Sequence, residues 1–236
     1  MFTGLVREIG TIKGARPTAG VMRLDIEAPR TAADLALGDS VAINGICLTV
    51  TAVRGRVFTV EAVGETRRLT TLGQWRSGRK VHLEPALRVG DALDGHLMQG
   101  HVDGLGKVQK LKRTGGGLAL TISAGPEQRR FLTPKGSVAV DGVSLTVDEG
   151  PFAAGFTVNL IPHTLQGTNF AGLRTGDQVN LEMDVLVKAA RSGEFSGLPS
   201  LDTNSNSNSN HKSPARREWT MDQLLAKGFS RPRPRK

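Results

Sequence analysis

The chain contains an internal repeat, and this repeat limits its possible folds more than any other feature. Residues 38–50 and 135–147 share Ser-Val-Ala, a glycine and Leu-Thr-Val in the same order, and the two glycines, Gly45 and Gly142, are 97 residues apart. Similarity at a fixed offset indicates repeated structural units. We therefore expect two units of the same fold, each roughly 95 residues long.

Three further pairs of segments extend the repeat at nearly the same offset. They are residues 3–6 with 99–102, 66–71 with 164–169, and 78–84 with 176–182. Because all these segments occur in the same order in both copies and at nearly the same offset, chance does not explain their similarity. We predict a first domain over residues 1–94, a second over 95–188, and a segment outside both over 189–236.

Apolar and polar residues alternate with a period of two in both copies. The alternation is clear in residues 22–27, 118–123 and 179–185. It is typical of strands that have one buried and one polar face. Short helices are expected at residues 31–35 and 127–132. Many short strands in a small domain favour an all-β fold, with each copy a closed or nearly closed antiparallel barrel, because closure removes exposed strand edges.

The composition excludes several classes of protein. Hydrophobic residues make up 38% of the 236 residues, and the longest apolar runs are far shorter than the ~20 residues that a membrane-spanning helix needs. No charged segment followed by an apolar stretch resembles a secretory signal. The single cysteine, Cys47, can form neither an internal disulfide nor a cysteine-based zinc site. We therefore expect a cytoplasmic protein that is not a disulfide scaffold, a collagen, a coiled coil or a transmembrane protein.

The basic charge is concentrated in the C-terminal tail. From Thr203 onward, eight basic residues stand against two acidic ones, within a chain of net charge +9. Residues 204–210 alternate Asn and Ser, which is typical of a flexible linker, and residues 219–229 are expected to form one short helix. Two interpretations stay open: the tail binds a nucleic acid or another anionic surface, or its helix docks on the body. The tail's partner is unknown.

Familiar cofactor and metal motifs are absent from the sequence. The five histidines are dispersed, and no phosphate-binding glycine loop or dinucleotide fingerprint occurs. Aromatic residues, at 4%, are too scarce for nucleic-acid recognition by base stacking on the barrels. We therefore expect neither a metal nor a Rossmann domain.

The two copies differ at four positions of chemical interest. Aligned by the repeat, His101 stands opposite Leu5, Asp141 opposite Asn44, Asp184 opposite Ala86 and Ser144 opposite Cys47, whereas Ser137 matches Ser40. Features shared by both copies would bind one kind of ligand twice, and unshared features could carry proton transfer on one ligand only. Ordinary structural roles remain the alternative for each: a strand histidine, an Asp-Gly turn, a solvated carboxylate and a small core cysteine.

Several motifs in register resemble the riboflavin synthase family of the alpha-chain type. They are residues 1–6, 44–50, 95–101, 141–147 and 160–165, and the resemblance covers roughly residues 1–190. It implies two tandem six-stranded antiparallel Greek-key barrels, each binding a lumazine, that form a homotrimer and need no cofactor. It also implies dismutation of two molecules of 6,7-dimethyl-8-ribityllumazine, in which a four-carbon unit passes from one to the other, giving riboflavin and 5-amino-6-ribitylaminouracil. An association with lumazine synthase is a further expectation.

The resemblance also implies two substrate pockets. The first would use Gly4, Leu5, Val6, Ser40, Cys47, Leu48, Thr49, Glu61, Ala62, Val63, Gly64, Glu65 and Thr66. The second would use Gly100, His101, Val102, Lys135, Ser144, Leu145, Thr146, Leu160, Ile161, Pro162, His163, Thr164 and Leu165.

Catalytic roles follow from the same resemblance. His101 is expected to transfer a proton, with Ser144 and Thr146 near it, while Asp141 and Asp184 orient partners or polarise the second ligand. Ser40 and Cys47 are expected to act at the first pocket as hydrogen-bond donors or in activating a nucleophile. A non-catalytic lumazine- or flavin-binding protein of the same fold is the alternative.

Overall fold

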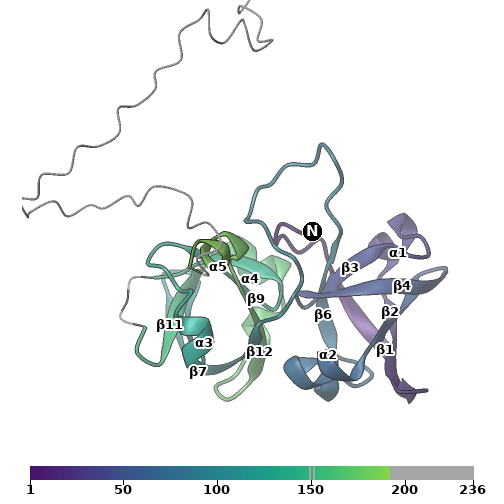
Figure 1. Ribbon diagram of the computed structural model, residues 1–236, viewed down its shortest axis with the longest axis horizontal. Coiled ribbons are helices and arrows are strands. Elements are labelled where there is room, and N and C mark those ends of the chain that lie inside the picture. Colours follow the sequence, from purple (N-terminus) through teal and green to yellow (C-terminus); the bar gives the residue numbers. More distant parts are fainter. Residues whose placement is uncertain (149, 151, 192–236) are drawn as a thin grey trace, which may run out of the picture. The chain divides into compact units, whose positions relative to one another are not determined.

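A computed structural model describes residues 1–148, 150 and 152–191, which form twelve strands in two sheets together with short helices. Figure 1 shows each sheet curled round on itself. The linker expected at residues 204–210 and the helix expected at 219–229 lie outside the described residues. The prediction of an all-β protein built from two barrels is confirmed.

The first sheet is a closed barrel with the strand order β1-β2-β5-β4-β3-β6. Its strands are β1 (Glu8–Thr18), β2 (Val21–Glu27), β3 (Ser40–Ile43), β4 (Ile46–Arg54), β5 (Val57–Ala62) and β6 (Lys80–Pro85). Its helices are α1 (Pro29–Asp34), α2 (Gly64–Leu69) and the 3-10 helix η1 (Thr71–Gln74). Antiparallel pairing of β6 with β1 closes the sheet.

The second sheet repeats this topology, in the order β10-β9-β12-β7-β8-β11. Its strands are β7 (Gly104–Thr114), β8 (Gly117–Ser123), β9 (Ser137–Val140), β10 (Val143–Thr146), β11 (Gly155–Leu160) and β12 (Gln178–Met183). Its helices are α3 (Pro126–Arg129), α4 (Pro162–Gly167), η2 (Phe170–Gly172) and α5 (Val185–Arg191). A bridge between Val147 and Val158 joins the two outermost strands, so this barrel closes more loosely than the first.

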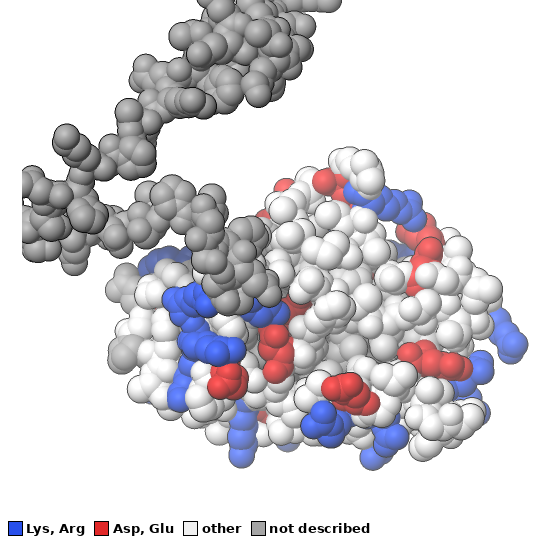
Figure 2. Space-filling view, viewed as in Figure 1, with Lys and Arg blue, Asp and Glu red and all other residues white. Residues whose placement is uncertain are grey.

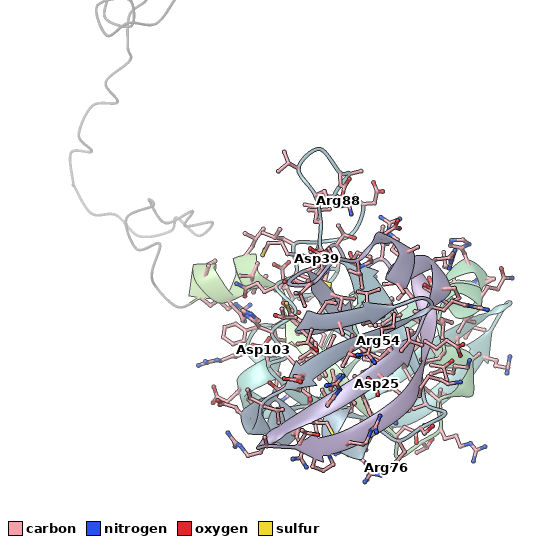
Figure 3. All side chains as sticks on the ribbon, turned by 90° about the vertical axis from the view of Figure 1, so that its right-hand side faces the viewer. Asp25, Asp39, Arg54, Arg76, Arg88 and Asp103 are labelled. Carbon is pink, nitrogen blue, oxygen red and sulfur yellow. The ribbon has the colours of Figure 1, made fainter. Side chains whose placement is uncertain are left out.

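Strand β2 shows why the alternating pattern produces a barrel. Leu24 and Ile26 are fully buried in the first core, where Trp75 also packs. Asp25, between them in sequence, points to the outer face, where its carboxylate lies 2.8 Å from the Arg16 guanidinium and accepts a hydrogen bond from Thr59 (Figure 3). Burying one face removes apolar area from water at roughly 25 cal/mol per Å², while the other face remains solvated.

The two barrels meet through matching turns. In the first copy, the His82 backbone N–H donates to Asn44 Oδ1 over 2.7 Å. In the second, the Asn180 backbone N–H donates to Asp141 Oδ1 over 2.8 Å. Two further contacts join one copy to the other. The His82 ring Nδ1 lies 2.9 Å from the Asp141 carbonyl oxygen, and Asn180 Nδ2 donates to the Asn44 carbonyl over 2.9 Å. The contact is therefore an approximate twofold arrangement of buried hydrogen bonds.

Two glycines allow this close contact. Gly45 and Gly142 both have φ of +77°, and a Cβ on Gly142 would lie 2.5 Å from the Gly45 nitrogen. The backbone of the partner turn therefore leaves no room for a Cβ at either glycine.

Replacing Gly142 by alanine should therefore lower the free energy of unfolding by about 2 kcal/mol, from left-handed strain and backbone overlap. Urea denaturation would measure the change. Gly172→Ala is the matched control, because nothing lies within 4 Å of a Cβ there and its φ is not left-handed. Equal stability of Gly142→Ala and the control protein would contradict the argument.

Candidate active site

Two short segments cross between the barrels. We call residues 2–6 the N-terminal arm and residues 95–102 the connecting arm. They run antiparallel: the Phe2 N–H donates to the Met98 carbonyl over 2.8 Å, and the Met98 N–H donates back over 3.0 Å. The His96 N–H donates to the Thr3 carbonyl over 3.1 Å. Each arm therefore fixes the position of the other.

A buried glutamate holds each arm in place. Glu84 at the end of β6 accepts the backbone N–H groups of Thr3 (2.7 Å) and Gly4 (3.0 Å). Glu182 in β12 accepts those of Gln99 (2.7 Å) and Gly100 (3.0 Å). Burial raises the pKa of both carboxyl groups, and these hydrogen bonds oppose the rise. The repeat pairs residues 84 and 182, but nothing in the sequence indicated that they bind the backbone of the arms.

Each arm lies against the barrel of the other copy. The Ser144 N–H of the second barrel donates to the Gly4 carbonyl over 2.9 Å, and the Cys47 N–H of the first barrel donates to the Gly100 carbonyl over 2.9 Å. Val6 packs on the second core and Val102 on the first. The structure thus places residues 4–6 against the second barrel and residues 100–102 against the first, the reverse of the expected grouping, while the membership of the two substrate pockets stays a prediction.

A cavity of about 240 Å³ opens on the second barrel beside the N-terminal arm. It brings together six of the predicted binding residues: Gly4, Leu5, Val6, Ser144, His163 and Thr164. The other residues in its lining are Arg7, Val143, Gly167 and Thr168. Backbone amides, a hydroxyl and apolar side chains around a concave space are typical of a small-molecule site.

Other residues predicted for this pocket lie around the cavity. Leu145 and Leu160 are buried in the second core, and Leu165 lines a neighbouring cavity of about 170 Å³. Ile161 and Pro162 are exposed at the start of α4, and Thr146 is exposed on β10. Lys135 lies before β9, with its ammonium 3.9 Å from the Asp148 carboxylate.

Ser144 has a partner that sequence analysis missed. Its Oγ lies 2.7 Å from Nδ1 of His96, whose side chain is 9% exposed. Burial lowers the pKa of His96, and the negative charge of Asp184 acts in the opposite direction. His96 belongs to the motif at residues 95–101, and that motif was the only signal in the sequence that could have indicated it. His101 lies instead between Gly100 and Val102, which both contact the first barrel.

The predicted residues of the first barrel surround the connecting arm. Cys47 is half-buried and packs against the cluster of Phe2, Ala42 and Met98. Leu48 is buried in the core and Thr49 is exposed. Ser40 lines a cavity of about 170 Å³ at the start of β3. The six residues 61–66 run from the end of β5 into α2: Glu61, Ala62, Val63, Gly64, Glu65 and Thr66.

The two predicted aspartates lie in different places. Asp141 lies in the turn between β9 and β10 and is buried in the contact between the barrels, where its carboxylate accepts the Asn180 N–H. Asp184 directly precedes α5, and its Oδ1 accepts the Leu186 N–H over 2.8 Å. Helix α5 is also held by the ion pair of Lys188 with Asp103, 2.9 Å apart; Asp103 is labelled in Figure 3.

Neither a membrane span nor a metal cluster occurs in the described part of the chain. No helix there is long and apolar enough to cross a bilayer, and no three His, Cys, Asp or Glu side chains there are grouped to hold a metal ion. On the face shown in Figure 2, basic and acidic side chains are interspersed with uncharged ones.

Comparison with known proteins agrees with the duplicated architecture. The Lumazine binding domain family matches residues 3–86 and again residues 99–184. Riboflavin synthase of Brucella abortus is 42% identical over 201 residues, covering 83% of this chain and 99% of that protein. Riboflavin synthase of Bacillus subtilis is 38% identical over 188 residues, covering 80% and 87%.

Solved structures of LumP share the fold. LumP complexed with 6,7-dimethyl-8-(1'-D-ribityl) lumazine has a TM-score of 0.70 at 23% identity, covering 78% of this chain and 99% of that chain. LumP complexed with riboflavin has a TM-score of 0.72 at 24% identity, with the same coverage.

The fold and the site thus define a protein of duplicated lumazine-binding domains. Within this class, the extent and level of identity are specific: the chain belongs to the riboflavin synthase family, whose members are transferases.

Proposed function

We propose that this chain converts two molecules of 6,7-dimethyl-8-ribityllumazine into riboflavin and 5-amino-6-ribitylaminouracil by transfer of a four-carbon unit. The observation that carries the proposal is the pair of crossed arms. They build two equivalent positions, one beside Cys47 and one beside Ser144, with the same backbone hydrogen bond at each. Two molecules of one substrate need two such positions, and a dismutation needs them to differ chemically.

The proposal assigns one lumazine to the unit of residues 1–94 and one to the unit of 95–188, with residues 189–236 outside both. Bringing two bound substrates together replaces a bimolecular encounter, which can lower a barrier by about 7–11 kcal/mol. Planar heterocycles suit a cavity lined by the backbone of residues 4–7 and by α4. The cavity residues named above would bind the second lumazine, and Cys47, Ser40 and His101 would act on the first.

We also propose that the productive site joins the first barrel of one subunit to the second barrel of another in a homotrimer. Leu186 on α5 is 64% exposed, which suits a helix that packs on a neighbouring subunit. Sedimentation would give the mass, and a monomer that retains full turnover would contradict this assembly. The association with lumazine synthase and the cytoplasmic location stay predictions.

A direct assay tests the activity. Purified protein mixed with 6,7-dimethyl-8-ribityllumazine should produce riboflavin fluorescence without any added cofactor, and one molecule of riboflavin should form for every two of lumazine consumed. A protein that binds the lumazine but leaves it unchanged would instead support the non-catalytic carrier. The complete set of His96, Ser144 and Asp184 at the second barrel favours the enzyme.

A further inference from the structure

Ser144 and His96 come together from separate parts of the fold, and Asp184, from a third part, acts on His96 through its charge. Ser144 lies on β10 and lines the second-barrel cavity. His96 comes from the connecting arm and places Nδ1 2.7 Å from the Ser144 hydroxyl. Asp184 directly precedes α5, and its charge acts on the His96 ring. The result is a hydroxyl that is hydrogen-bonded to an imidazole at the cavity wall, and a nearby carboxylate that acts on the imidazole through its charge without a hydrogen bond to it.

The surroundings fix the imidazole. Gly95 lies so close to the N-terminal arm that a Cβ there would overlap the Thr3 carbonyl oxygen, and it would also be 3.2 Å from the Ser144 Cβ. The His96 N–H donates to the Thr3 carbonyl. The ring Nε2 is buried and has no hydrogen-bond partner among the described residues. A buried, neutral imidazole keeps one unprotonated nitrogen, which can accept a proton from the serine hydroxyl.

We propose that His96 is a positioning residue that makes Ser144 the proton acceptor for the lumazine bound in the second-barrel cavity. This inference rests on the proposed function. The hydroxyl of Ser144 directs its proton to His96 Nδ1 and turns an oxygen lone pair toward the cavity. The relay therefore acts on one of the two substrates, the one held by the second barrel.

A C–H bond of the acidic methyl group on the lumazine breaks, and its electron pair remains delocalised on the ring system. The proton forms a new O–H bond on Ser144, while the original hydroxyl proton forms an N–H bond on His96. The imidazolium is stabilised by the carboxylate of Asp184, and the proton returns by the same route later in the cycle.

The first barrel provides an internal comparison. Cys47 occupies the position equivalent to Ser144, with the same backbone hydrogen bond from its N–H to an arm. Among residues 1–148, 150 and 152–191, its thiol makes no hydrogen bond, and the imidazole that Ser144 has is missing there. Cys47 and Ser144 thus make the same backbone hydrogen bond to an arm, but only Ser144 has an imidazole that can accept its proton.

A double-mutant cycle on the full chain tests the relay. In His96→Asn, kcat for riboflavin formation should fall about 100-fold with KM changed less than about twofold, because positioned acid–base groups contribute that much to the chemical step. Ser144→Ala should lose a similar factor, and the double variant should be no slower than Ser144→Ala alone, because the two residues act as one unit. Exchange of the lumazine methyl protons with D2O, followed by NMR, should slow in the same pattern.

Controls separate this inference from a structural role and from the proposed function. His96→Asn should lower kcat by the same factor in a Cys47→Ala protein as in the wild type, because the thiol lies at the other barrel. His96→Gln is the second variant if His96→Asn does not fold. The relay alone would be overturned if His96→Asn lowered kcat by the same factor in the Ser144→Ala protein as in the wild type. It would also be overturned if His96→Asn raised KM and left kcat unchanged. A wild-type protein that forms no riboflavin would overturn the proposed function and the relay with it.

Discussion

Replacing Asp141 by asparagine should stabilise the protein at pH 8 by up to about 4 kcal/mol. Asp141 is 3% exposed, and burial raises the pKa of its carboxyl from 3.8 to about 7, although the Asn180 hydrogen bond and the Arg79 charge oppose the rise. A rise of about three units corresponds to about 4 kcal/mol at 1.36 kcal/mol per unit. Asparagine keeps an oxygen for the Asn180 N–H and removes the buried charge. It also adds a buried Nδ2, which at the equivalent Asn44 has no hydrogen-bond partner within the described part of the chain, so about 4 kcal/mol is the upper bound of the gain.

Proton linkage determines how the effect of Asp141→Asn on stability changes with pH. The folded state binds the Asp141 proton more tightly than the unfolded chain does, so this group favours folding fully below pH 3.8 and less as the pH rises to about 7. His82 acts in the opposite direction, because burial lowers its pKa to about 4 and its protonation disfavours folding between pH 6.5 and 4. Comparing Asp141→Asn with wild type cancels the His82 contribution. The difference should therefore be close to zero near pH 4 and grow to its full value above pH 7.

Urea denaturation at pH 4, 6 and 8 would measure this difference. The repeat supplies a matched control, because Asn44 occupies the equivalent turn, where its Oδ1 accepts the His82 N–H, and it is 1% exposed. Asn44→Asp should lose stability at pH 8 by a comparable amount. If Asp141→Asn gave the same gain at pH 4 as at pH 8, buried ionisation would not be its cause.

Asp141→Asn is also expected to change the activity. Asn44 shows that a neutral amide oxygen can accept the same hydrogen bond at this turn, so the hydrogen bond does not require the carboxyl at position 141, whose buried charge reduces stability. Residues that reduce stability in this way are expected at functional sites. Asp141→Asn should therefore lower turnover while it raises stability, and unchanged turnover would remove Asp141 from the predicted catalytic set.

The repeat made the fold predictable, but not the way the copies join. Period-two alternation in residues 22–27 and 118–123 was enough to predict β2 and β8, because burial of alternate residues is a local property. The crossing of the arms was not predictable, because residues 4–6 keep the same offset from residues 100–102 whichever barrel they contact. What decides the crossing is a pair of carboxylates, Glu84 and Glu182, that bond to backbone far away in sequence.

The site was predictable only where motif residues face the cavity. Gly4, Ser144 and His163 met this condition. His96 did not, because its role depends on one hydrogen bond to a residue 48 positions away. A histidine inside a matched motif gives no sign of which neighbour it contacts. His101 belongs to the same motif as His96, yet it does not contact Ser144 in the same way.

Glu182→Ala should lower the free energy of unfolding by about 2–4 kcal/mol and loosen the site of the first barrel. The change removes the acceptor of two backbone N–H groups, Gln99 and Gly100, and an unsatisfied buried donor costs about 1–3 kcal/mol. Gly100 in turn accepts the Cys47 N–H, and a Cβ on Gly100 would lie 2.6 Å from the Cys47 Cβ. Release of the connecting arm should therefore expose Cys47.

Because Cys47 is the only cysteine, its reaction with a thiol reagent reports on one position, where its N–H donates to the connecting arm. Glu182→Ala should raise the rate about tenfold, the factor that corresponds to 1.4 kcal/mol of weaker protection, and Glu182→Gln should raise it less, because the amide retains one acceptor oxygen. Glu84→Ala is the mirror-image control: it frees the N-terminal arm, which lies on the second barrel through Gly4 and Ser144. It should weaken lumazine binding at the second-barrel cavity and have the smaller effect on Cys47. If Glu84→Ala exposed Cys47 as much as Glu182→Ala does, each arm would not serve the opposite barrel, and the unequal pair of sites on which the proposed dismutation depends would lose its structural basis.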